Sequence, residues 1–166
     1  MTADPQIIPA IIEKSIIASL KIQVNTDVKV QTSTAKDVIK KYSIDCLSTL
    51  NMKSPDILGT LSLAFPEKTY LELLNRMIGE KYPKVDASNS DGSSEILNII
   101  YANARKEINT KGFNFDPAIP STVVGKQIEM STSATDGLAY FFEASSDVGS
   151  FLVIVGLKKM TAMKKV

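Results

Sequence analysis

Two polar residues three positions apart in one helical segment could together bind a partner and orient a water molecule. Glu95 and Asn98 lie in the segment 93–110, and at about 100° per residue they are neighbours on one side of a helix. A carboxylate there can pair with a cation of a partner, and a carboxamide can orient a water molecule through directed hydrogen bonds. The same residue types are also ordinary on a solvent-facing helix, so the pair alone leaves both interpretations open.

The helix that carries this pair has an apolar face on its other side. The core side is predicted to consist of Ile96, Leu97, Ile100, Ala104 and Ile108, and the solvent side of Glu95, Asn98, Ala102, Lys106 and Asn109. Asp91, at the start of the segment, is predicted to be a turn or capping residue. We therefore expect Glu95 and Asn98 to be exposed on a helix that is held by its opposite face.

The other segments predict the elements that must position this helix. Isoleucines at every fourth position predict an amphipathic helix that starts after Pro5 and ends near Leu20. Apolar and polar residues alternate over 22–32, which predicts one bent strand or a short pair of strands. The segment 38–48 is ambiguous between helix and strand, and a strand is favoured from Tyr42 onward. A strand over 56–65, a helix over 68–78 and three strands near 121–125, 138–143 and 151–157 complete the order.

This order predicts an α+β fold in a single domain, residues 1–166. We expect a mostly antiparallel β-sheet with two long helices and an N-terminal helix packed on one face. The pattern of a helix followed by strands occurs twice, at 5–65 and 93–157, which suggests an internal duplication.

The composition excludes several kinds of catalytic site. The chain has no histidine and one cysteine, Cys46, which excludes Ser-His-Asp and Cys-His catalysis, histidine-ligated metals and an internal disulfide. Nineteen Lys and Arg against 18 Asp and Glu give a net charge of +1, so we expect no nucleic-acid partner. The start, Met1-Thr2-Ala3-Asp4-Pro5, lacks the features of a signal peptide, and the apolar run 151–157 is too short to span a membrane. We therefore expect a cytoplasmic protein without a membrane partner.

Three segments resemble one family. The run 94–104 (SEILNIIYANA) is similar to the E-x-x-N helix of the CheX/CheC/FliY chemotaxis phosphatases, and Asp91 lies where the longer form of that motif has an acid or serine. The run 115–125 (FDPAIPSTVVG) resembles the family's proline-valine segment, and 59–65 (GTLSLAF) resembles its glycine-bearing strand. In the first helix, Glu13 is followed by Ile16 where a second motif would have asparagine, so the chain resembles the one-site CheX type.

The resemblance implies an enzyme, a protein aspartyl-phosphate phosphatase that acts on a CheY-like response regulator. It implies that Glu95 docks on the regulator and that Asn98 orients the attacking water. It also implies a homodimer and no cofactor of its own, because the Mg²⁺ belongs to the regulator. Two alternatives remain: a non-catalytic dimeric CheX-like adaptor that binds a response regulator or a flagellar-switch component, and a structural domain with no role in phospho-signalling.

Overall fold

The elements follow the predicted order, with one addition, a short 3-10 helix. The computed structural model describes residues 3–131 and 137–161, so Met1 and Thr2 of the N-terminal segment considered above lie outside the described residues. The helices are α1 (Ile7–Val24), α2 (Glu67–Ile78) and α3 (Asp91–Thr110), together with a short 3-10 helix, η1 (Lys36–Lys41). The strands are β1 (Lys29–Ser33), β2 (Cys46–Lys53), β3 (Ile57–Phe65), β4 (Ser121–Val124), β5 (Leu138–Ser146) and β6 (Gly149–Lys159).

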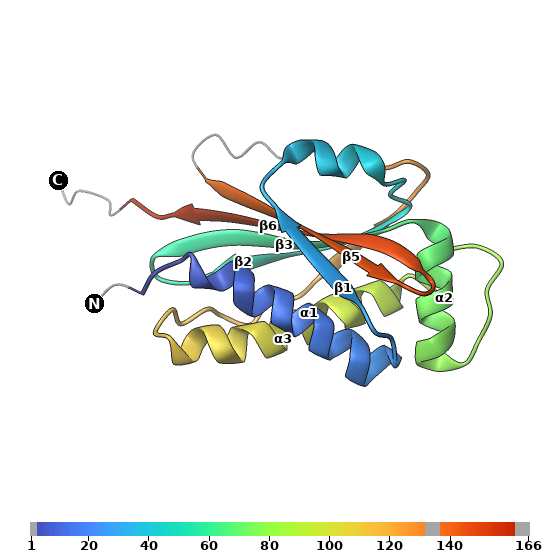
Figure 1. Ribbon diagram of the computed structural model, residues 1–166, viewed down its shortest axis with the longest axis horizontal. Helices are drawn as coiled ribbons and strands as arrows, with labels where there is room; N and C mark the ends of the chain where they lie inside the picture. The colour runs from blue at the N-terminus through green and yellow to red at the C-terminus, as the bar shows by residue number, and fades with distance from the viewer. Residues whose placement is uncertain (1–2, 132–136, 162–166) are drawn as a thin grey trace.

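The six strands form one sheet in the order β1-β5-β6-β3-β2-β4. Every pairing between these strands is antiparallel. Figure 1 shows α1 and α3 side by side on one face of the sheet, α2 at one end, and η1 on the opposite face. The predicted fold class, an antiparallel α+β sheet with three helices packed on one face, is confirmed.

The two halves of the chain exchange their edge strands. Each half consists of a helix, an edge strand and a hairpin, in the order α1-β1-β2-β3 and then α3-β4-β5-β6. The edge strand β1 pairs with β5 of the second half, and β4 pairs with β2 of the first half. The two hairpins meet at the centre, where β3 pairs with β6. The repeated order predicted from the sequence is therefore present in the elements.

The main core lies between the sheet and the three helices. Every fourth residue of α1, namely Ile8, Ile12, Ile16 and Leu20, has no exposed surface, and these side chains join Phe65, Phe142 and Phe151 of the sheet in one buried cluster. Complete burial of one such side chain stabilises the fold by about 1.5–3 kcal/mol. A smaller cluster on the other face joins Val38 of η1 to Phe141 and Ile154.

The predicted end of the first helix is wrong. Helix α1 continues past Leu20 to Val24, because Val24 lies one turn further along the same stripe and is only 1 % exposed. Asn25 then ends the helix in the left-handed region, with a φ of 48°, and donates its N–H to the carbonyl of Leu20. The strand expected from Ile22 therefore begins only at Lys29.

The segment 38–48 also differs from the prediction. It starts within η1, where Val38 is buried in the smaller cluster, and the strand begins at Cys46, not at Tyr42, and extends to Lys53. The hydroxyl of Tyr42 donates to Glu143 of β5 at 3.0 Å, which holds this segment over the outer face of the sheet.

Asp45 closes the corner where β2 begins, α2 begins and β4 ends. Helix α2 is preceded by Pro66, which has no side chain that can accept a hydrogen bond from the first turn. The buried carboxylate of Asp45 takes this role, because its Oδ2 accepts the N–H of Glu67 at 3.0 Å. Its Oδ1 accepts the N–H of Gln127 at 3.1 Å, in the loop that follows β4. One side chain therefore caps a helix and fixes a loop.

Candidate functional site

Helix α3 presents Glu95 and Asn98 to solvent. The five residues predicted on its core side are all buried, whereas Glu95, Asn98, Ala102 and Lys106 are exposed. Within the described part of the chain, neither Glu95 nor Asn98 forms a side-chain hydrogen bond or an ion pair with another residue. An acid and an amide are thus held side by side on a rigid helix with their polar atoms available to a partner.

Two residues of this helix do not have their predicted roles. Asp91 is the first residue of α3, and no side chain caps the helix, so Asp91 contributes a negative charge near the positive end of the helix dipole. Asn109 was expected on the solvent side, but it is half-buried. Its Oδ1 accepts the N–H of Phe115 at 2.7 Å and its Nδ2 donates to the Phe115 carbonyl at 3.0 Å, which fixes the turn after α3.

A chain of four hydroxyl groups joins the start of α3 to the sheet. Thr122 of β4 lies 2.5 Å from the hydroxyl oxygen of Ser94 and 2.6 Å from that of Ser48 in β2. The Ser48 hydroxyl donates to Ser93 at 2.7 Å. Because each hydroxyl has one proton, Thr122 must donate to Ser48 and Ser94 must donate to Thr122. Ser93 lies next to the buried Cys46 thiol. Burial raises the pKa of this thiol to about 11, and the hydrogen bond from the Ser93 hydroxyl acts in the opposite direction.

Helix α2 fixes the first turn of α3 from the other side. The hydroxyl of Tyr70 donates to the carbonyl of Asn89 and accepts the N–H of Ser93 at 3.2 Å. Gly92 allows this approach, since a Cβ at that position would lie 2.6 Å from Leu74 and 2.9 Å from the Tyr70 hydroxyl. The turn that precedes Glu95 is therefore held on two sides.

Helix α1 has no second pair of this kind. Ile16 is fully buried, as the apolar stripe predicts. Glu13 is half-buried, and its Oε2 accepts the hydroxyl of Thr32 in β1 at 2.7 Å. In α1 the carboxylate itself joins the helix to the edge strand. In α3 the neighbouring Ser94 makes the corresponding bond, so Glu95 is left exposed.

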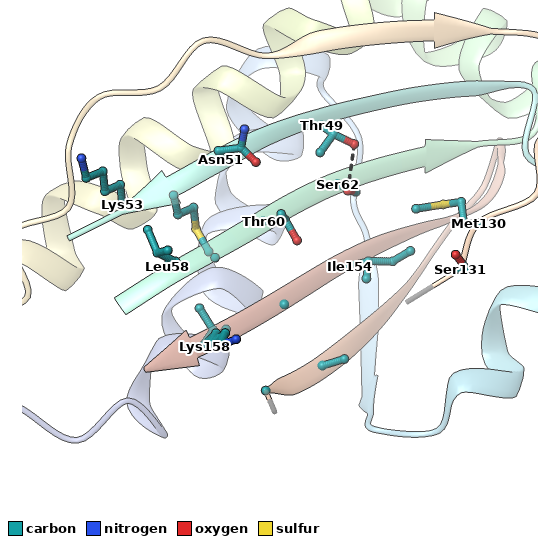
Figure 2. A pocket seen from close by; sticks show the side chains of 16 residues that line it. Thr49, Asn51, Lys53, Leu58, Thr60, Ser62, Met130, Ser131, Ile154 and Lys158 are labelled. Carbon is teal, nitrogen blue, oxygen red and sulfur yellow. Dashed lines mark hydrogen bonds between the residues drawn. The ribbon is translucent and has the colours of Figure 1, made fainter. Parts of the chain in front are cut away.

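A hollow of about 690 Å³ lies on the other side of the sheet. Figure 2 shows Thr49, Asn51 and Thr60 pointing into it from β2 and β3, with Lys53 and Lys158 at one end. Neither Glu95 nor Asn98 lines this hollow. Both are exposed on α3, where a macromolecular partner can reach them.

Two further features of the described residues bear on partners. In the ranges 3–131 and 137–161, no group of three or more acidic or cysteine side chains is arranged to hold a metal ion. None of the helices within those ranges has the length and apolar character needed to cross a membrane.

Comparisons with known proteins agree on one family. Residues 52–143, more than half of the chain, match the family model of the chemotaxis phosphatase CheX. No curated protein matches the sequence. A CheC-like superfamily protein from Shewanella sp. PV-4 is similar in structure, with 27 % identity, a TM-score of 0.83, and coverage of 91 % of this chain and 97 % of the other.

Two other solved structures share the fold. The chemotaxis protein CheX of Vibrio vulnificus has 24 % identity and a TM-score of 0.83, over 91 % of this chain and 99 % of its own. The CheX of Borrelia burgdorferi, solved in complex with CheY, BeF₃ and Mg²⁺, has 15 % identity and a TM-score of 0.69, over 90 % of this chain and 97 % of its own. Since the family model covers more than half of the chain, including α2, the whole of α3 and strands β3 and β4, the chain belongs to the chemotaxis phosphatase CheX family.

Proposed function

We propose that this protein hydrolyses the aspartyl phosphate of a CheY-like response regulator, with Glu95 docking on the regulator and Asn98 orienting the attacking water. The observation that carries the proposal is the exposure of both side chains, side by side and without bonds to other described residues, on a helix whose opposite face is buried. Membership of the CheX family supports the reaction class. The Borrelia burgdorferi complex, in which a protein of this fold holds CheY, supports the choice of partner.

The proposed chemistry requires little more than orientation. A water oxygen bonds to phosphorus while the bond from phosphorus to the aspartate oxygen breaks, which releases inorganic phosphate and a free carboxylate. The carboxamide oxygen of Asn98 accepts a hydrogen bond from that water and holds it in line with the leaving carboxylate. Because an acyl phosphate is already activated, positioning and electrostatics supply most of the acceleration. Mg²⁺ belongs to the regulator in this proposal, and the chain has no cofactor of its own.

Glu95 has the docking role. Its carboxylate pairs with a lysine of the regulator beside the phosphoryl group and so fixes the angle at which α3 approaches. An exposed ion pair of this kind contributes more to orientation and association rate than to affinity, and it weakens as salt screens it.

Two further expectations belong to the same proposal. We expect a homodimer, and the sheet has two edge strands, β1 and β4, each with a single neighbour in the sheet order. We also expect the protein in the cytoplasm, where a kinase phosphorylates receiver domains.

The decay of a phosphorylated CheY-like receiver tests the proposal. We expect the native protein to accelerate the decay, and Asn98→Ala to remove about 100-fold or more of that acceleration while still binding the beryllofluoride-loaded receiver. Glu95→Ala should weaken both binding and turnover. Asn51→Ala is the matched control, because Asn51 is also an exposed amide, and its side chain forms no hydrogen bond to another described residue, but it lines the hollow on the other face.

Two outcomes would contradict the proposal. Binding of the receiver without faster decay would identify the protein as an adaptor. Full activity in Asn98→Ala would show that the water is oriented by another group.

A further inference from the structure

We propose that Thr122 is a positioning residue for Asn98, and that its hydroxyl sets the rotation of α3 about its own axis. The inference rests on the proposed function, because it assigns the residue that keeps the proposed water-orienting amide in place. Thr122 lies on the edge strand β4 and belongs to neither the exposed pair nor the core.

The position of Ser94 explains why this bond controls rotation. Ser94 precedes Glu95 and lies about one turn before Asn98, so the directions of Ser94 and Asn98 from the helix axis differ by only about 40°. The hydroxyl of Thr122 is 2.5 Å from that of Ser94, and it is held in turn by Ser48 at 2.6 Å. This bond joins the rim of the helix to the sheet, on the side that also carries Asn98, whereas the buried residues of α3 hold its opposite face.

The size of the effect follows from helix geometry. Side-chain atoms at the surface of a helix lie about 5–6 Å from its axis, so a rotation of about 10° moves them by about 1 Å. A displacement of about 1 Å in a catalytic group can reduce the rate about 100-fold. A hydroxyl bond that prevents a rotation of this size is therefore sufficient to decide whether the Asn98 amide reaches the water.

Beyond Asn98, α3 is held by the Asn103 amide, which donates to the Ser19 hydroxyl of α1 at 3.0 Å, and by the Tyr101 hydroxyl, which donates to the Asp116 carbonyl at 2.7 Å. Other contacts hold its first turn. The Tyr70 hydroxyl holds the N–H of Ser93 at 3.2 Å, which fixes the start of α3 along its axis. The Ser48–Ser93 bond lies at the buried side of the helix. Of the hydroxyl bonds to α3 from the sheet, the bond from Thr122 is the one that reaches Ser94.

Three variants test the proposal. Thr122→Val keeps the shape of the side chain and removes both bonds, Thr122→Ser keeps the hydroxyl, and Ser121→Ala changes the exposed neighbour, whose hydroxyl has no side-chain partner among the described residues. We expect Thr122→Val to lower kcat for receiver dephosphorylation about 10-fold to 100-fold with KM changed less than about twofold. Thr122→Ser and Ser121→Ala should keep kcat within about twofold of the native value.

A second measurement does not depend on activity. The phase of the backbone N–H residual dipolar couplings along α3 reports the rotation of the helix about its axis. We expect a phase change of about 10° in Thr122→Val, the rotation used above, and none in the two other variants.

The outcomes are distinguishable. A phase change in Thr122→Val together with loss of kcat supports the proposal. An unchanged phase, an unchanged kcat, or a loss of kcat that only follows the folded fraction in circular dichroism overturns it. If the native protein does not accelerate receiver decay, the proposed function fails, and the phase alone then decides whether Thr122 positions Asn98.

Discussion

Replacing Asp45 by alanine removes the two hydrogen bonds that its side chain accepts from backbone N–H groups at this corner of the domain. The carboxylate of Asp45 is buried, and its two oxygens accept the N–H of Glu67 at 3.0 Å and the N–H of Gln127 at 3.1 Å. Alanine has no acceptor, and Pro66 cannot supply one, so the first turn of α2 loses its cap. The N–H of Gln127 loses a charge-assisted bond at the same time.

The expected loss of stability is about 3 kcal/mol. Removal of a helix cap costs about 1 kcal/mol, and loss of a hydrogen bond to a charged group costs about 1.5–3 kcal/mol. For a domain of this length, a loss of about 3 kcal/mol lowers Tm by about 6–12 °C. Asp45→Asn should lose about half as much, because its amide retains one acceptor oxygen but turns an NH₂ group towards the second N–H.

Thermal and urea unfolding of the two variants measure these differences. Asp37→Ala is the matched control, because the Asp37 side chain is 88 % exposed and, among the described residues, forms an ion pair only with Lys40 on the surface, at 3.2 Å. Such a pair contributes less than about 1 kcal/mol. If Asp45→Ala unfolds within about 1 °C of the control, or if Asp45→Asn is as stable as the native protein, the assignment of the cap to Asp45 is wrong.

Two further predictions concern ionisable groups. The Lys126 ammonium and the N–H of Val85 lower the pKa of Glu67, so its contribution to stability is present above the pKa of an unfolded glutamate, about 4.3, and is lost as the pH falls through the folded pKa. Unfolding experiments should therefore show Glu67→Gln less stable than the native protein at pH 7, with the difference shrinking towards pH 3; a difference that is constant with pH would contradict this origin. The Cys46 thiol is fully buried with a pKa of about 11, so an aromatic disulfide reagent at pH 8 should react slowly with the folded protein and at once in denaturant. Rapid reaction in the folded state would show that the thiol is accessible.

Hydrophobic periodicity predicted most of the fold because it reports burial. It identified the buried face of α3 and the stripe of α1, since each stripe repeats over several turns. The prediction from periodicity failed where the same residues fit both the helical period of 3.6 and the strand period of 2. Ile22 and Val24 alternate as in a strand, but Val24 is also one helical turn beyond Leu20. The helix continues to Val24 because this places its side chain in the core.

The contacts that support the candidate site carry no such pattern. The exposure of Glu95 and Asn98 was predictable from the helix wheel, because exposure depends on the residues of one element. The bond from Thr122 to Ser94 joins residues 28 positions apart, and that from Ser48 to Ser93 joins residues 45 apart. Serine and threonine also occur commonly in turns and loops, so their presence in a sequence does not show which of them form hydrogen bonds with each other. Only the folded sheet shows these pairs.

The exchange of edge strands between the two halves decides the order of folding events. The N-terminal half cannot complete its share of the sheet alone, because the neighbour of β1 is β5, and the paired residues Lys29 and Ser145 are 116 positions apart. Contacts this distant in sequence form late and slowly. During synthesis, β1 and the sheet-facing isoleucines of α1 lack part of their cover until β5 and β6 have emerged. We therefore expect that neither half folds independently, because the edge strand of each half has its neighbour in the other half.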